Sequence, residues 1–155
     1  MIFISCSFDP FSMPYGEQVF SLFEEYGVKA YLAKHPASGP LPQVLKSDIE
    51  RADALVALVT DRVSRWQETE ITWAHDLKKP IYGIVQKDAT VGGLLPYVTK
   101  YIEFAIFDPE SLNEAITETI NSISEMKDQL QQRNLLIAGI GLLALAAAIG
   151  ISQSK

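Results

Sequence analysis

The sequence has little of the chemistry that disulfides, metals and nucleic acids require. Cys6 is the only cysteine among 155 residues, which excludes an internal disulfide. The two histidines, His35 and His75, do not cluster with it, so no metal site is expected. The net charge of -6 argues against nucleic acid as a partner, because surfaces that bind nucleic acid are rich in Lys and Arg.

Two further absences narrow the class of protein. No G-x-G-x-x-G run follows the first apolar segment, so a dehydrogenase of the Rossmann type is not supported. Residues 1–4 are apolar without a basic start, and the chain turns polar at Ser5, so we expect no signal peptide. A single free cysteine agrees with a reducing compartment.

A regular alternation of apolar runs and helical patterns fills most of the sequence. Strands are predicted at residues 2–7, 28–33, 54–60, 80–85 and 101–107, with helices at 15–26, 41–52, 64–77 and from 108 onward. Such alternation predicts an α/β fold with a parallel sheet and helices on both faces. Five strands favour the flavodoxin-like order 2-1-3-4-5, in one domain that covers residues 1–126.

The end of the sequence has a different composition. Residues 135–151 carry no charge and nothing more polar than glycine. As a helix at about 1.5 Å per residue this run is ~26 Å long, close to the thickness of a hydrocarbon core. We therefore expect a transmembrane helix at 135–151, a single-pass C-terminal anchor, joined to the domain by a helical juxtamembrane extension at 127–134.

The charges beside this run predict its orientation. Lys127 and Arg133 lie on the domain side and Lys155 on the other, so the positive-inside rule places the domain in the cytoplasm. Ala146 and Gly150 form a pair of small residues that permits packing of helix against helix. A homo-oligomer through this helix is one expected partner interaction, and the membrane is another.

Residues 64–77 hold the leading candidate for an active site. Trp66 and Glu70 stand four apart, so an indole and a carboxylate share one flank at the amino end of the predicted helix. The start of a helix that follows a strand lies at the carboxyl edge of an open α/β sheet, where ligands bind. Glu68, two residues before Glu70, points elsewhere on the helix and serves as an internal control.

The end of the first strand supplies the other candidates for binding a substrate. Ser5, Ser7 and Asp9 can hydrogen-bond a ribose or phosphate there, with Phe8 between them, although they can equally end the strand and cap the next helix. Gly39 lets the backbone approach a ligand, but a simple turn explains it more readily. Cys6 has neither a helix N-terminus nor a histidine beside it, so we interpret it as strand core rather than as a nucleophile.

Three segments together suggest a family. Residues 3–9 are an apolar strand ending in Ser-x-Ser-x-Asp, residues 48–53 read Asp-Ile-Glu-Arg-Ala-Asp, and residues 64–71 read Ser-Arg-Trp-Gln-Glu-Thr-Glu-Ile. In order and spacing they resemble the Toll/interleukin-1 receptor (TIR) domain family over about residues 1–125. The last segment is similar to the Ser-x-Trp-Cys-x-x-Glu-Leu box of that family, with Gln67 in place of Cys. The loop 34–40 is only loosely like the family's BB loop, which gates the site and mediates assembly.

The resemblance implies that Glu70 is the catalytic residue of an enzyme that cleaves NAD, in a TIR protein of bacterial or archaeal type. Cleavage of the nicotinamide–ribose bond develops positive charge on the ribose, and nicotinamide leaves as a neutral base. One carboxylate beside the ribose therefore suffices, with no cofactor and no metal. The function expected is a membrane-anchored NAD nucleosidase that hydrolyses or cyclises NAD in signalling or immune defence. NAD is then a substrate, Trp66 borders it, and TIR contacts support self-association.

Two alternatives remain open from the sequence. One is a non-catalytic TIR-type interaction module at a membrane, which has no use for a carboxylate in a pocket. The other is an enzyme like the nucleoside deoxyribosyltransferases, which share a similar sheet and also carry a glutamate on the helix after a strand. That family resembles this chain less, because its Asp-x-Gly-Thr turn corresponds to residues 60–64, which contain no glycine.

Overall fold

The structure is a computed structural model and describes residues 1–33 and 43–148. The chain divides into two units, the first being Met1–Ile120 and the second beginning at Asn121. The helix α4 (Pro109–Ala148) is continuous through residues 120 and 126 and covers the predicted extension at 127–134. The domain boundary at residue 126 stays a prediction.

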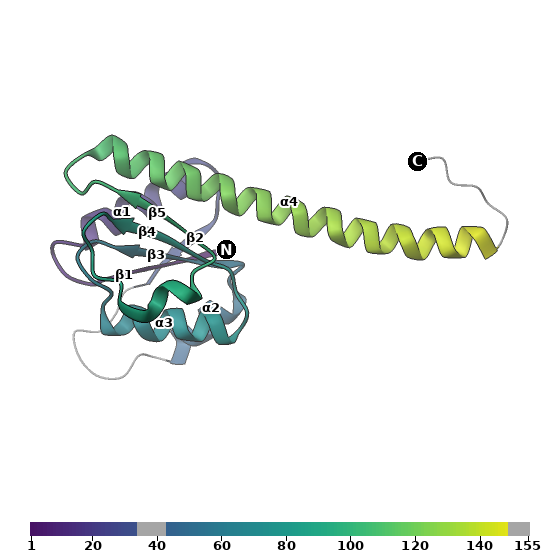
Figure 1. Cartoon of the computed structure of the whole chain (residues 1–155), viewed down its shortest axis with the longest axis horizontal. Coiled ribbons are helices and arrows are strands. Elements are labelled where there is room, and N and C mark those ends of the chain that lie inside the picture. The colour runs from purple at the N-terminus through teal and green to yellow at the C-terminus, as the bar shows by residue number, and fades with distance from the viewer. Residues whose placement is uncertain (34–42, 149–155) are drawn as a thin grey trace. The chain divides into compact units, whose positions relative to one another are not determined.

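Strands and helices alternate along the first unit (Figure 1). The strands are β1 (Ile2–Cys6), β2 (Ala30–Leu32), β3 (Ala54–Val59), β4 (Ile81–Gln86) and β5 (Lys100–Phe104). The helices are α1 (Met13–Glu25), α2 (Gln43–Arg51), α3 (Arg65–Asp76), the 3-10 helix η1 (Gly92–Tyr97) and the first turns of α4. All neighbouring strands pair in parallel in the order β2-β1-β3-β4-β5. The predicted flavodoxin-like sheet is confirmed.

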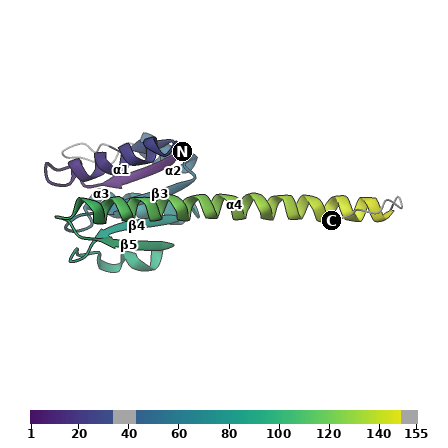
Figure 2. The same cartoon turned by 90° about the horizontal axis from the view of Figure 1, so that it is seen from above.

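Side chains of β1 alternate between the two faces of the sheet, and this alternation decides which helix each one meets. Phe3 packs in a core cluster with Ile49 of α2 and Ile71 of α3. Cys6, on the other face, lies against Gly16 of α1. Figure 2, which looks onto one face of the sheet, shows β1, β3, β4 and β5 side by side in that order. Because Ser5 has the same parity as Phe3, its side chain must face α3.

Two strands are shorter than the sequence predicts by two residues or more. Residues 28–33 were expected to form a strand, but β2 begins only at Ala30, because the N–H of Val28 donates to Phe23 O across the end of α1. Gly27, at φ +75, takes the left-handed conformation that this helix end requires. The fifth strand ends at Phe104 rather than at residue 107, because the N–H of Ala105 donates to the Ser111 hydroxyl.

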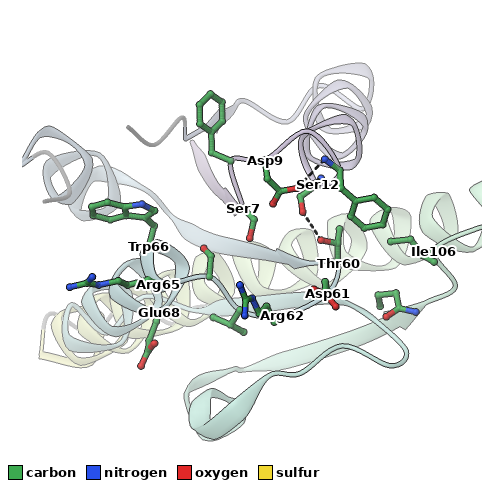
Figure 3. A pocket seen from close by; sticks show the side chains of 15 residues that line it. Ser7, Asp9, Ser12, Thr60, Asp61, Arg62, Arg65, Trp66, Glu68 and Ile106 are labelled. Carbon is green, nitrogen blue, oxygen red and sulfur yellow. Dashed lines mark hydrogen bonds between the residues drawn. The ribbon is translucent and has the colours of Figure 1, made fainter. Parts of the chain in front are cut away.

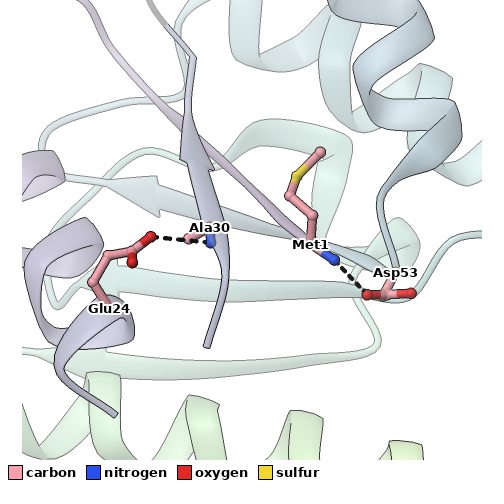
Figure 4. Close-up of polar contacts among 4 residues, drawn as sticks. All are labelled: Met1, Glu24, Ala30 and Asp53. Atoms are coloured by element: carbon pink, nitrogen blue, oxygen red, sulfur yellow. Dashed lines mark hydrogen bonds and ion pairs between the residues drawn. The ribbon is translucent and has the colours of Figure 1, made fainter. Parts of the chain in front are cut away.

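The amino edge of the sheet is fastened by contacts on either side of β1 (Figure 4). The Met1 ammonium donates to Asp53 Oδ2 at 2.6 Å, and the N–H of Asp53 donates to Met1 O at 2.8 Å. Ala30 N donates to the Glu24 carboxylate at 3.5 Å. Asp53, the last residue of the second family-like segment, therefore has a structural role at the edge opposite the candidate site.

Close packing of α1 on β1 leads to a first prediction. A Cβ at Gly16 would lie 2.6 Å from Cys6 Sγ, which is shorter than any relaxed contact. Gly16→Ala should therefore lower the free energy of unfolding by about 1–3 kcal/mol through overpacking, although alanine normally stabilises a helix. Denaturant titration measures this loss.

Two variants test the cause of that loss. Gly93→Ala is the matched control, because a Cβ at Gly93 meets no atom within 4 Å and should change stability little. Cys6→Ala in the Gly16→Ala background removes the clashing sulfur. The free energy of unfolding of the double variant should therefore fall by less than the sum of the losses in Gly16→Ala and Cys6→Ala. A loss equal to that sum would contradict the clash.

Within residues 1–33 and 43–148, the structure contains no helix with the length and apolarity needed to cross a membrane. The predicted anchor at 135–151 ends in residues 149–151, which lie outside the described part of the chain.

Candidate active site

Ser5 and Glu70 form the polar contact at the centre of the site. The Ser5 hydroxyl donates to Glu70 Oε1 at 2.6 Å, the length of a charge-assisted hydrogen bond to a carboxylate. Ser5 is the second-last residue of β1, and Glu70 lies on the second turn of α3. The contact therefore joins the carboxyl end of β1 to α3, the helix that follows the neighbouring strand β3.

Both side chains are fully buried, at 0% exposure. Removing a carboxylate from water costs several kcal/mol unless hydrogen bonds replace its hydration. The side chain of the predicted catalytic Glu70 is thus not solvated on an amphipathic helix but buried against the sheet. Buried carboxylates of this kind are concentrated at functional sites and in polar networks that fix packing.

Gln67 ties the ends of two strands to the start of α3. Its Nε2 donates to Leu58 O at 2.7 Å and to Ser5 O at 3.2 Å. Its Oε1 accepts from Ser64 N at 3.1 Å and from the Ser7 hydroxyl at 3.4 Å. Gln67 was not among the predicted site residues, although Ser64-x-x-Gln67 has the spacing of a capping box, which the structure contains.

A cleft of about 990 Å³ opens beside this network (Figure 3). It lies where β1 and β3 end, and the helices that follow them cover opposite faces of the sheet, the position where ligands bind in such folds. The sequence-predicted residues that line it are Ser7, Phe8, Asp9 and Trp66. Ser5 and Glu70 do not line this cleft, and Gly39 lies outside the described residues.

Trp66 and Glu70 were expected to share one flank of their helix, but only Trp66 reaches the cleft. A separation of four residues advances about 6 Å along the axis, slightly more than one full turn. The first turn of α3 therefore borders the cleft, while the second lies against β1. Glu68 is exposed and lines the cleft, and its side chain points away from Ser7 (Figure 3).

Asp9 organises the turn between β1 and α1. Its Oδ1 accepts from the N–H groups of Phe11 and Ser12 at 3.0 and 2.9 Å. The Ser12 hydroxyl lies 2.7 Å from the Thr60 hydroxyl, a buried contact between the loops after β1 and β3. The sequence allowed Asp9 either a structural role at the end of the strand or a role in binding. The structure shows the structural role, because Asp9 closes the turn.

The Cys6 thiol is unreactive at neutral pH. Burial raises the pKa of its thiol to about 12, and the charges of Glu70 and Asp9 act in the same direction. Almost no thiolate exists at neutral pH, and the thiolate is the reactive form. The interpretation of Cys6 as strand core is confirmed by its complete burial in β1.

Solved structures share this fold at low sequence identity. A flavodoxin-like domain from Synechococcus sp. matches with 14% identity and a TM-score of 0.60, over 83% of this chain and 99% of that one. The CMP N-glycosidase BcmB of Clostridium botulinum matches with 17% identity and a TM-score of 0.53, over 73% of this chain and 96% of its own. At these identities the likeness shows a flavodoxin-like fold and nothing about activity.

The TIR domains of the activated Roq1 resistosome also match, with 10% identity over 84% of this chain and 76% of that one. Their TM-score of 0.46 is too low to carry an argument about this chain. No family model and no curated protein matches the sequence. The resemblance to TIR domains therefore rests on the three segments described above.

Proposed function

We propose that this protein cleaves the N-glycosidic bond of a nucleotide, with NAD as the first substrate, and that Glu70 is its catalytic carboxylate. The observation that carries the proposal is the 2.6 Å hydrogen bond from Ser5 to Glu70 at the carboxyl end of β1. The contact lies, with its buried carboxyl group, beside the point in the sheet where ligands bind in folds of this kind. The adjoining cleft of about 990 Å³ is large enough for a nucleotide.

The proposed chemistry requires only one carboxylate. As the bond between C1′ and the nicotinamide nitrogen breaks, its electron pair leaves with the neutral base and positive charge develops on the ribose. The Glu70 carboxylate would oppose that charge, and the new bond to C1′ then forms from water, which releases its proton to solvent, or from a ring nitrogen of the adenine. Glu70 is fully buried and does not line the cleft, so its side chain must turn toward the cleft for the carboxylate to touch the ribose.

A second candidate function is hydrolysis of CMP to cytosine and ribose 5-phosphate. It is favoured by the likeness to BcmB, which extends over 96% of that chain. Cytosine, unlike nicotinamide, needs a proton to leave as a stable neutral base, so this reaction requires a general acid. A non-catalytic TIR-type interaction module is the third possibility and predicts no chemistry at Glu70.

One experiment separates these functions. The full-length chain is incubated with NAD or with CMP, and the products are resolved by chromatography. Nicotinamide with ADP-ribose or a cyclic product supports the NAD reaction, whereas cytosine with ribose 5-phosphate supports the CMP reaction. Unchanged substrates at high protein concentration and on liposomes would overturn both and favour the interaction module.

We also propose that residues 135–151 anchor the chain in a membrane with the domain in the cytoplasm, because this run carries no charge. The full-length chain should then float with liposomes in a density gradient. Replacing Leu142 and Leu143 by Asp should abolish flotation, because each charge at the centre of a membrane helix costs about 2.5–3.5 kcal/mol. Equal flotation of both proteins would refute insertion through this segment.

A further inference from the structure

Arg62 supplies a positive charge to the cleft. It follows β3 by three residues and lines the cleft with Ser7 and Trp66. Among residues 1–33 and 43–148, no carboxylate forms an ion pair with it and no side chain accepts a hydrogen bond from it. An unpaired guanidinium in a protein with a net charge of -6 offers a binding position for an anion.

The backbone at Arg62 is fixed by its neighbours. Val63 N donates to Thr90 O at 3.1 Å, and Thr90 N donates to Asp61 O at 2.8 Å, so Arg62 forms an isolated parallel bridge with Thr90. The guanidinium is therefore attached to a segment held on both sides. A donor group on a fixed support binds its ligand with a smaller loss of conformational entropy.

The surroundings of Arg62 include further donors and three acids. Ser7 and Arg62 point toward the middle of the cleft, whereas Arg65 points away from both (Figure 3). Ser12 and Thr60, whose hydroxyls are in contact, line the same cleft. Asp9, Asp61 and Glu68 also line it, but Asp9 already accepts two backbone N–H groups, which offset part of its charge, and the Glu68 side chain points away from Ser7.

We propose that Arg62 binds the phosphate of the substrate, so that the cleft selects phosphorylated nucleosides, dinucleotides included, over free nucleosides. This inference rests on the proposed function for the nature of the ligand and adds the group by which the ligand is recognised. Guanidinium and phosphate match in geometry and form charge-assisted hydrogen bonds. Trp66 and the half-exposed Phe8 offer aromatic faces at the same cleft for the base.

Equilibrium binding tests this proposal without catalysis. The probes are AMP with adenosine and CMP with cytidine, pairs whose members differ only by the phosphate, titrated into the full-length chain in mild detergent. In at least one pair, the nucleotide should bind the unsubstituted chain about 10- to 100-fold more tightly than its nucleoside. Arg62→Gln should abolish that difference and leave nucleoside affinity unchanged. Arg65→Gln, the matched control in the same cleft, should preserve it within threefold.

Three results would overturn the inference: no binding of any probe, equal binding within both pairs, or discrimination that survives Arg62→Gln. Both arginines are exposed, so thermal denaturation should confirm that their variants fold like the unsubstituted chain. Failure here is separate from failure of the proposed function. If Arg62 discriminates nucleotide from nucleoside but no substrate is cleaved, the phosphate site is retained and the proposed enzymatic function is rejected. If substrate is cleaved and Arg62→Gln does not affect the cleavage, the enzymatic function is retained and the phosphate site is rejected.

Discussion

Glu70→Gln is expected to reduce the rate of NAD cleavage about 10³-fold, equivalent to about 4 kcal/mol of transition-state stabilisation. The amide keeps the shape of the side chain but removes the negative charge that opposes the cationic ribose. Its carbonyl oxygen still accepts the hydrogen bond that Ser5 donates, so the fold should be retained. Release of nicotinamide, followed by chromatography, measures the rate.

The matched control for this prediction is Glu68→Gln on the same helix. Glu68 is exposed at the rim of the cleft, two residues from Glu70, and the same change in formal charge there should alter the rate less than threefold. The comparison separates the effect of the Glu70 carboxylate on the rate from the effect of the protein's overall charge. Equal rates for Glu70→Gln and the unsubstituted chain, or equal losses in both variants, would remove Glu70 from the proposed mechanism.

Gln67→Glu should produce the largest loss of stability among the changes considered. The substituted side chain is almost the same size, but a carboxylate cannot donate to Ser5 O and Leu58 O, which the Gln67 amide reaches at 3.2 and 2.7 Å. Two buried carbonyl groups are left without their donor and face a negative charge. The free energy of unfolding at pH 7 should fall by about 2–4 kcal/mol, as measured by denaturant titration.

The pH dependence of this variant identifies the cause. The buried carboxyl is favoured in its protonated form, which regains one donor, so its pKa in the folded protein lies above the value of about 4.3 expected in the unfolded chain. Its stability relative to the unsubstituted protein should therefore be greatest below about pH 4 and fall as the pH rises through the folded pKa. Gln18→Glu is the control, because the Gln18 amide makes an exposed hydrogen bond to Asn113, and should show little change. A pH-independent loss would contradict the explanation.

The sheet could be predicted from the sequence because periodicity reports which residues face a core. Fully buried strands such as β3 appear as continuous apolar runs, and the alternation with helices fixes parallel pairing. Strand ends were less predictable. The length of β2 depends on where the chain leaves α1, and Val28 is apolar whether or not it pairs.

The site was predicted in part for a similar reason. Ser7, Phe8 and Asp9 follow the central strand β1, and Trp66 lies in the first turn of α3, which follows the neighbouring strand β3. Because the carboxyl ends of parallel strands meet at one edge of the sheet, these residues reach the same cleft. The burial of Glu70 was not predictable, because it depends on the rotation of α3 relative to the sheet. Arg62 was missed because an arginine in a turn has no periodic signal, and only the structure shows that it has no side-chain partner among residues 1–33 and 43–148.

The Gln67 amide has a consequence for how a ligand enters. It links the last part of β1, the end of β3 and the cap of α3 through four hydrogen bonds, so none of the three can shift alone without breaking one of them. The three segments beside the cleft are thus held together before any ligand binds. We therefore expect little of a ligand's binding energy to be spent on reshaping them.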